Sequence, residues 1–234
     1  MEAKKYSVDV PRKKCVTPIC RGSYVNILEP KILPQSDKLA WGMQCLFPKN
    51  EITKAWAADL KKIYSQVLLD KFGKEKAAGI AKALAATNSL PLRDGDGAEN
   101  AGLANIDQLA GHYFINSNNK FRQPHIIGAL GKVVDPTILG PDDIYSGAWY
   151  RVMLEFWYYD TAGNKGISTT LVGIMKVKDD DNLGAGTSST EAAAEFNAFA
   201  NEAADLFNVE LEEVAEKEEV KKEEVEKEEV FNFM

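Results

Sequence analysis

A regular alternation of apolar and mixed positions runs from residue 145 to residue 159 and is the clearest pattern in the chain. Its even positions from Ala148 to Tyr158 are apolar throughout. Because successive side chains of a strand point to opposite faces, this pattern predicts one long strand with its even residues in the core. Shorter extended segments are predicted at 22–29, 39–47, 111–117, 124–134 and 167–178.

Helical spacing replaces the alternation between the second and third predicted strands. Asn50 is a suitable N-cap, apolar residues then recur at helical intervals, and Gly73 suits the C′ position. An Ala-rich helix is expected to follow, so that a helical insertion spans 51–86. Five or six strands in up-and-down order close most simply into a small barrel. The predicted fold class is therefore mainly β with inserted helices, an OB-fold-like five-stranded barrel over residues 22–188.

The two ends of the chain lack this order. Residues 1–21 are basic, contain two prolines and show no apolar period, so they are predicted to be a flexible arm. Residues 189–208 follow the spacing of an amphipathic helix. Residues 209–234 repeat Glu-Glu-Val at intervals that match no helical period, which predicts a disordered acidic tail. Two aromatic residues near its tip have nothing to bury against and are candidates for the pocket of a partner protein: Phe231 and Phe233.

The net charge of −7 is unevenly distributed. Residues 1–178 contain 24 Lys and Arg against 17 Asp and Glu, a net of +7. The remaining residues contain 4 Lys against 18 Asp and Glu, a net of −14. A basic body is typical of a protein that binds a polyanion, and an acidic tail in the same chain can compete for the same surface.

The odd positions of the long strand are unusual for a face that meets water. They combine Trp149, Trp157 and Tyr159 with Arg151, although exposing an indole forgoes burial worth about 2 kcal/mol or more. A flat ligand stacked on these rings would explain them, and stacking of a nucleobase on an aromatic side chain is worth about 1–3 kcal/mol. The competing interpretation, which the sequence leaves open, is that this face packs beneath the helices at 51–86.

Basic residues accompany the predicted strands. A groove that follows a single-stranded backbone needs cations for the phosphates and rings for the bases. An isolated lysine is more simply explained as a solvated surface residue, so the signal lies in the segregation of charge. With the four residues of the long strand, the predicted binding set is completed by Lys120, Phe121, Arg122, Lys132, Lys165 and Lys176.

Motifs for catalysis or metal binding are incomplete. His112 and His125 have no metal-ligand spacing, and Cys15 and Cys20 lack a second cysteine pair. The segment 94–99 matches only the start of a calcium loop, so a plain turn is favoured over a divalent ion. No enzymatic activity, cofactor or metal is expected. A sparse cysteine set, no secretory signal and no membrane-length apolar run predict a cytoplasmic protein, in the host cell if viral.

Several short motifs, in order along the chain, resemble the single-stranded DNA-binding proteins of tailed bacteriophages. The resemblance spans about residues 20–185 and implies an OB-fold, sequence-independent binding of single-stranded DNA, and a role in phage replication and recombination. The motifs are Gly22-Ser23-Tyr24-Val25 with Pro30-Lys31, Leu92-Arg93-Asp94-Gly95-Asp96, Ile144-Tyr145-Ser146-Gly147, Gly163-Asn164-Lys165-Gly166-Ile167 with Leu171, and Asn182-Leu183-Gly184.

The C-terminal end carries a second resemblance. Phage and bacterial single-stranded DNA-binding proteins often end in an acidic tail whose aromatic or apolar tip recruits replication or recombination proteins. Phe231 and Phe233 fit that role, although the final Met234 departs from the pattern. The alternatives are a strand-annealing recombination mediator and an interaction or virion protein that binds no DNA. The sequence leaves the formation of a homo-oligomer open.

Overall fold

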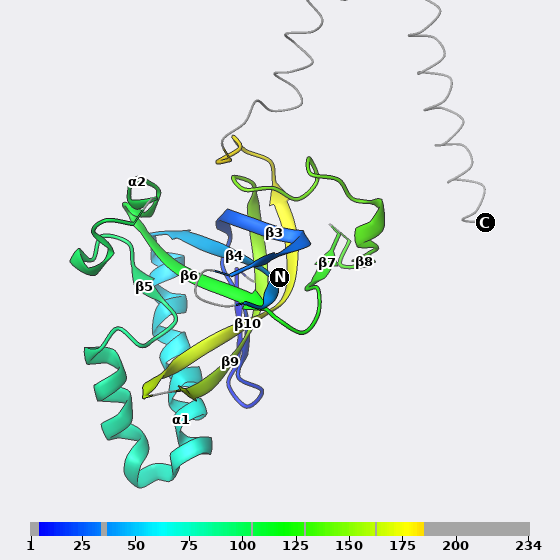
Figure 1. The fold of residues 1–234 in the computed structure, drawn as a ribbon. Helices are drawn as coiled ribbons and strands as arrows, with labels where there is room; N and C mark the ends of the chain where they lie inside the picture. The colour runs from blue at the N-terminus through cyan, green and yellow to red at the C-terminus, as the bar shows by residue number, and fades with distance from the viewer. Residues whose placement is uncertain (1–4, 34–36, 104, 129, 162, 185–234) are drawn as a thin grey trace, which may run out of the picture. The chain divides into compact units, whose positions relative to one another are not determined.

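The computed structural model describes residues 5–33, 37–103, 105–128, 130–161 and 163–184 (Figure 1). The strands are β1 (Ser7–Asp9), β2 (Lys14–Val16), β3 (Cys20–Ile32), β4 (Leu39–Pro48), β5 (Arg93–Asp94), β6 (His112–Asn119), β7 (His125–Ile127), β8 (Val133–Val134), β9 (Trp149–Thr161) and β10 (Asn164–Lys178). The helices are α1 (Glu51–Ala86) and the short α2 (Ile106–Leu109), with single 3₁₀ turns at Ala98–Asn100 and Pro136–Ile138.

Five long strands form a closed ring. Its order is β9–β3–β4–β6–β10, and β10 returns to pair with β9 along almost its whole length. Neighbours in the ring are antiparallel except β6 and β10, which are parallel and meet at one residue pair, Asn118 with Thr170. This is the five-stranded, partly open barrel of an OB-fold. The predicted class, mainly β with an inserted helical segment, is confirmed.

Helix α1 begins and bends where the sequence predicts. The Asn50 side chain accepts a hydrogen bond from the backbone N–H of Thr53 at 2.9 Å, which caps the N-terminus. Gly73 interrupts the helical backbone with a φ of 72°, in the left-handed region that glycine adopts at low cost. The helix therefore bends sharply at Gly73 and divides into two arms, which accounts for the two helices expected over 51–86.

The helix packs on the even face of β9. Tyr64 meets Phe156 edge-on at 5.7 Å between ring centroids, and Phe72 meets Tyr158 at 4.9 Å. The even side chains from Tyr150 to Phe156 are buried, whereas Trp157 is 46% exposed. The interpretation that the odd face packs beneath the helices is therefore wrong, because the helix covers the opposite side chains.

The expectation of a flexible arm over residues 1–21 is wrong for its described part, residues 5–21. β1 and β2 form a hairpin, and β2 adds to the edge of β9 by pairing Cys15 with Leu154. Cys15 is only 2% exposed, and the hydroxyl of Tyr6 donates to Asp59 of α1 at 3.0 Å. Strands of three residues are too short to show an alternating pattern of apolar residues. The charges and prolines were therefore the only visible features of this segment, and they favoured a flexible arm.

Several boundaries also differ from prediction. The long strand begins at Trp149, its partner β10 begins at Asn164, and the segment expected to be extended over 124–134 is an antiparallel hairpin of β7 and β8. β3 continues past the predicted end at 29 through Pro30 to Ile32, and β6 continues past the predicted end at 117 to Asn119. The predicted helix at 189–208 and the acidic tail at 209–234 lie outside the described residues. Within the described residues, no helix is long and apolar enough to cross a membrane.

The alternating burial on β9 predicts opposite outcomes for two adjacent aromatic residues. Phe156→Ala should lower the free energy of unfolding by about 3–5 kcal/mol, because it empties a core site. Trp157→Ala should lower it by about 1 kcal/mol or less, because that ring is half-exposed. Urea denaturation of both variants checks this difference. Equal losses for the two variants would mean that Trp157 belongs to the core.

Candidate nucleic-acid interface

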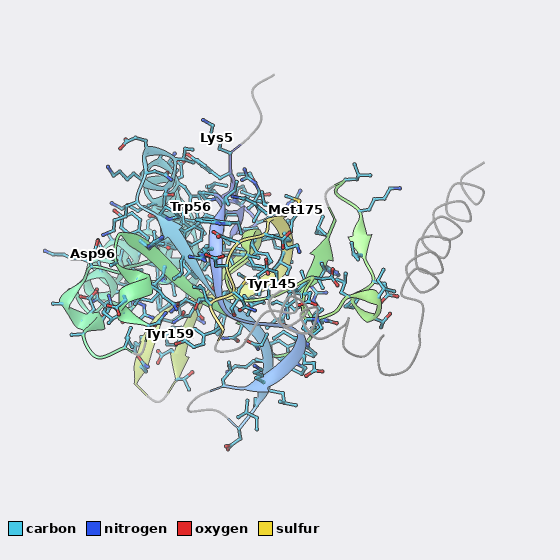
Figure 2. All side chains as sticks on the ribbon, turned by 90° about the horizontal axis from the view of Figure 1, so that it is seen from above. Lys5, Trp56, Asp96, Tyr145, Tyr159 and Met175 are labelled. Atoms are coloured by element: carbon cyan, nitrogen blue, oxygen red, sulfur yellow. The ribbon has the colours of Figure 1, made fainter. Side chains whose placement is uncertain are left out.

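The predicted residues of β9 lie at two separate ends of the strand. Trp149 and Trp157 are eight positions apart in sequence, which is about 26 Å at 3.3 Å per residue. Figure 2 shows Tyr159 at the β9–β10 hairpin and Met175 farther along β10. One compact site cannot therefore contain both indoles, and the two ends are described in turn.

The hairpin end presents a continuous outer strip, defined by Trp157 and Tyr159 of β9, Ser168 and Thr170 of β10, and Asn116 and Asn118 of β6. The indole Nε1 of Trp157 donates to the hydroxyl of Thr170 at 3.1 Å, and Thr170 lies opposite Asn118. The rings of Trp157 and Tyr159 meet at 67° with centroids 6.2 Å apart. The strip thus joins two aromatic rings to a row of small hydroxyl and amide groups.

A tight turn borders this strip at the end of β6. The Asn119 side-chain oxygen accepts from the backbone N–H groups of Phe121 and Arg122 at 3.0 and 3.1 Å, and its amide donates to the carbonyl of Leu171 at 3.1 Å. Phe121 is 93% exposed between the exposed Lys120 and Arg122. The turn is therefore anchored to β10 while it displays a ring and two cations.

The outer face beside the strip is covered on the β4 side. Leu46, Leu109 and Phe114 form a second, smaller core beneath α2. The Asn105 amide donates to Gln44 of β4 at 2.5 Å, which fixes this cover in place. The outer face is therefore covered next to α2, whereas Asn116, Trp157 and Thr170 remain at least partly exposed.

Two more predicted cations lie apart from each other. Lys165 stands at the β9–β10 hairpin, where its ammonium is 3.3 Å from a carboxylate oxygen of Asp160. Both side chains are about half-exposed, so solvent screens this pair strongly. Lys132 is exposed next to β8, on the excursion that follows β7. Lys165 borders the outer strip, and Lys132 belongs to a different part of the barrel surface.

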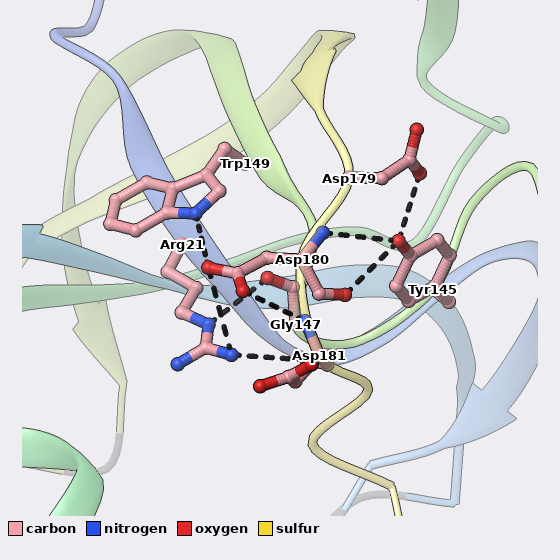
Figure 3. A network of polar contacts seen from close by, with 7 residues as sticks. All are labelled: Arg21, Tyr145, Gly147, Trp149, Asp179, Asp180 and Asp181. Carbon is pink, nitrogen blue, oxygen red and sulfur yellow. Dashed lines mark hydrogen bonds and ion pairs between the residues drawn. The ribbon is translucent and has the colours of Figure 1, made fainter. Parts of the chain in front are cut away.

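The other end of β9 is occupied by aspartates (Figure 3). The indole Nε1 of Trp149 donates to the carboxylate of Asp180 at 2.7 Å. Arg21 lies 3.9 Å from the same carboxylate and donates to the backbone carbonyl of Asp181 at 3.0 Å. Lys176 pairs with Asp179 at 2.9 Å. Trp149 and Lys176 therefore already have anionic partners within the chain.

Arg151 also has partners within the chain. Its guanidinium donates to the backbone carbonyls of Lys5 and of Thr17, the latter at 3.1 Å. It borders an apolar pocket of about 360 Å³ between β2, β9, β10 and the β7–β8 hairpin, with Met153 and Met175 on its wall. These contacts give Arg151 a structural role in holding the N-terminal hairpin.

The candidate calcium loop is also engaged internally. The ammonium of Lys49 lies 2.5 Å from a carboxylate oxygen of Asp94 and 2.5 Å from one of Asp96. These contacts hold the pKa of Asp96 below its usual range, with the Lys49 hydrogen bond as the largest cause. The two carboxylates thus stabilise the turn by their ion pairs with Lys49.

Six residues of the strip and its borders were not among the predicted binding residues: Asn116, Asn118, Asn119, Ser168, Thr170 and Arg93. Asn119 carries a usable signal, since an asparagine side chain often accepts from the backbone two residues on. Thr170 carries none, because its neighbours come from strands distant in sequence, whereas Arg93 belongs to the motif Leu92-Arg93-Asp94-Gly95-Asp96. Arg93 lies on β5 with its guanidinium 4.4 Å from the ring centroid of Phe114.

Residues 13–207 match the family model described as Enterobacter phage Enc34, ssDNA-binding protein. The chain belongs to this family. No curated protein matches the chain in sequence.

Solved structures of the family share the fold. The single-stranded DNA-binding protein from bacteriophage Enc34 in complex with ssDNA is 16% identical, with a TM-score of 0.59 over 79% of this chain and 100% of that chain. A C-terminal truncation of the same phage protein is 17% identical, with a TM-score of 0.60 over 78% of this chain and 95% of that chain. At identities this low, the likeness shows a shared fold. The residues of the interface are therefore inferred from the structure of this chain.

The network around Trp149 predicts a dependence of stability on pH. The pKa of Asp180 lies below its usual range, chiefly because Trp149 donates to the carboxylate, then because the N–H of Asp181 does, with a further contribution from Arg21. The stabilising contribution of Asp180 is therefore present above the ordinary aspartate pKa of about 3.9 and is lost as the pH falls through the folded value.

Asp180→Asn should accordingly lower the thermal midpoint at neutral pH, and the gap from wild type should close as the pH falls below about 4. Thermal unfolding at several pH values measures this, with Asp142→Asn, an exposed aspartate outside the network, as the matched control. A gap that stays constant across the series would contradict the assignment.

Proposed function

We propose that this protein binds single-stranded DNA without sequence preference and covers it during phage DNA replication and recombination, in the host cytoplasm. The observation that carries the proposal is the half-exposed Trp157 beside Tyr159 on the outside of an OB-fold barrel, in a chain of this family. An unstacked base can lie on such rings whatever its identity, because every base has a π-face.

The polar side chains of the outer strip are also suited to contact with single-stranded DNA. Ser168, Thr170, Asn116 and Asn118 offer hydroxyls and amides that both donate and accept. Such groups can meet base edges or sugar oxygens without requiring one sequence. They also lack branched apolar bulk, so the sugar–phosphate backbone can approach the sheet.

Cations border the strip on two sides. Lys120 and Arg122 flank it at the turn after β6, and Lys165 flanks it at the hairpin. We assign these three to phosphates and Phe121 to an additional base. Trp149, Arg151, Lys132 and Lys176 lie outside the strip. The contacts of Trp149, Arg151 and Lys176 within the chain argue against a primary role for these side chains.

We further propose that the tail at 209–234 competes with DNA for this basic surface. The tail contains 11 Glu and 4 Lys, a net of −7, against the net of +7 over residues 1–178. DNA binding would release it, and Phe231 and Phe233 would then be available to replication or recombination proteins. The support is the opposite charge of the two parts.

Trp157→Ala should weaken binding to oligothymidylate about 5- to 150-fold, the equivalent of one lost base stack of about 1–3 kcal/mol. Trp157→Phe should retain most of the affinity, because it keeps a ring. Fluorescence anisotropy titrations measure both, with Leu69→Ala on α1 as the control for an exposed apolar side chain. An unchanged affinity of Trp157→Ala for the oligonucleotide would show that the strip does not contact DNA. A wild-type protein that binds no oligonucleotide would overturn the proposed function.

Deletion of 209–234 should tighten DNA binding at low salt and have little effect at high salt, because salt screens the attraction between tail and barrel. The same titrations at two salt concentrations measure this. A full-length variant with the tail glutamates changed to glutamine separates charge from length and should behave like the deletion. Equal affinities with and without the tail at low salt would refute tail competition.

A further inference from the structure

A polar pocket of about 270 Å³ adjoins the outer strip beside β6 and β10. Its walls include Ser89, Arg93, Asn116, Tyr159 and Ser168. Pockets for drug-sized ligands span about 300–1,000 Å³, so this one fits a group of nucleobase size rather than a longer ligand. Tyr159, Asn116 and Ser168 belong to the pocket and to the strip at once, which makes the two continuous.

The pocket follows from the topology of the barrel. β6 and β10 pair as strands only at Asn118 and Thr170, so their backbones form no continuous ladder. Side-chain hydrogen bonds bridge the two strands on either side of that pair, from Asn119 to the Leu171 carbonyl and from Thr169 to the Asn116 carbonyl. The segment after α1 packs against β10. Its Ser89 carbonyl accepts from the N–H of Ile167 at 3.0 Å, and β5 pairs with β6 by placing Arg93 opposite Phe114. Backbone pairing on both sides therefore fixes the position of the pocket walls.

Arg93 supplies the charge. It is the one charged residue among the pocket walls. Its guanidinium lies over the ring of Phe114 at 4.4 Å, and within the described part of the chain it forms no hydrogen bond and no ion pair. Burial lowers the pKa of Arg93, while the negative charge of Glu99 nearby acts in the opposite direction. A guanidinium has five N–H donors, and a half-buried one without acceptors suits an incoming anion.

Tyr159 supplies the aromatic wall, and Gly166 places it there. A Cβ atom on Gly166 would lie 2.6 Å from the tyrosine oxygen and 2.7 Å from the Ser89 carbonyl oxygen. Only the absence of a side chain lets the ring cross β10 while Ser89 pairs with the next residue. The ring thus lines the pocket and also contacts Trp157, its neighbour on the strip.

We propose that this pocket receives one nucleotide of the bound strand, with Arg93 donating to its phosphate and the Tyr159 ring stacking on its base. The inference rests on the proposed function and deepens it by naming a site and a residue, Arg93, that the strip alone does not include. A cation, an aromatic wall and neutral hydroxyl and amide groups together match a nucleotide. A free mononucleotide shares this chemistry, so the test distinguishes it from a nucleotide within a strand.

The test compares Arg93→Gln with Arg12→Gln, which removes the same charge from an exposed arginine on the β1–β2 hairpin. Log affinity for oligothymidylate is measured against log salt. Each phosphate contact on single strands contributes about −0.7 to the slope. Arg93→Gln should make the slope shallower by about 0.7 and weaken binding at low salt, and Arg12→Gln should leave both unchanged. Equal slopes for Arg93→Gln and wild type, with wild type still binding, would overturn the pocket and leave the proposed function intact.

Two further arms keep the result interpretable. Asn88→Asp places a carboxylate at an exposed position of the pocket wall that lies outside the outer strip, and it should weaken binding even if Arg93→Gln fails to fold. Thermal unfolding of each variant identifies that failure. Titration with thymidine monophosphate should show only weak binding. Loss of monophosphate binding in Arg93→Gln, with an unchanged oligonucleotide slope, would overturn the assignment to the bound strand.

Discussion

The antiparallel pairing of β9 with β10 closes the barrel and sets which side chains it leaves in contact with solvent. It runs from Trp149 to Thr161 and fixes which side chains of β9 face the core. The even side chains from Tyr150 to Phe156 are buried in the barrel core and against α1. The odd aromatic residues therefore lie on the outside. A shift by one residue would exchange the two sets and bury Trp157 instead. The outward indole is therefore a consequence of register rather than of a local loop.

The outer surface of the barrel differs from one side to another in which residues cover it. On one side α2 and its cover bury Leu46 and Phe114, and at the far end of β9 three aspartates engage Trp149, Arg21 and Lys176. Where β6 and β10 meet, no comparable cover is present among the described residues, and hydroxyls, amides and half-exposed rings meet water. The surface available to single-stranded DNA is therefore defined by two things. One is the set of exposed residues of the strip, and the other is the cover on the neighbouring faces of the barrel.

Local signals in the sequence predicted the elements well. The Asn50 cap, the break at Gly73 and the alternation on β9 each depend on neighbours a few residues away, and each is confirmed. Partners across the fold were not predictable. Trp149 meets Asp180 and Arg151 meets the carbonyl of Thr17 only because distant strands adjoin. The β1–β2 hairpin was missed for the same reason, since β9 rather than its own sequence supports it.

In the proposed complex, single-stranded DNA lies across the outer strip between β6 and the β9–β10 hairpin. Photo-crosslinking of full-length protein to an oligonucleotide containing 5-iodouracil, followed by mass spectrometry of the linked peptides, locates the bound strand. We expect crosslinks at Trp157, Tyr159 and Phe121. Crosslinks concentrated at Trp149, or on the exposed face of α1, with none on the β9–β10 hairpin, would contradict this placement of the strand.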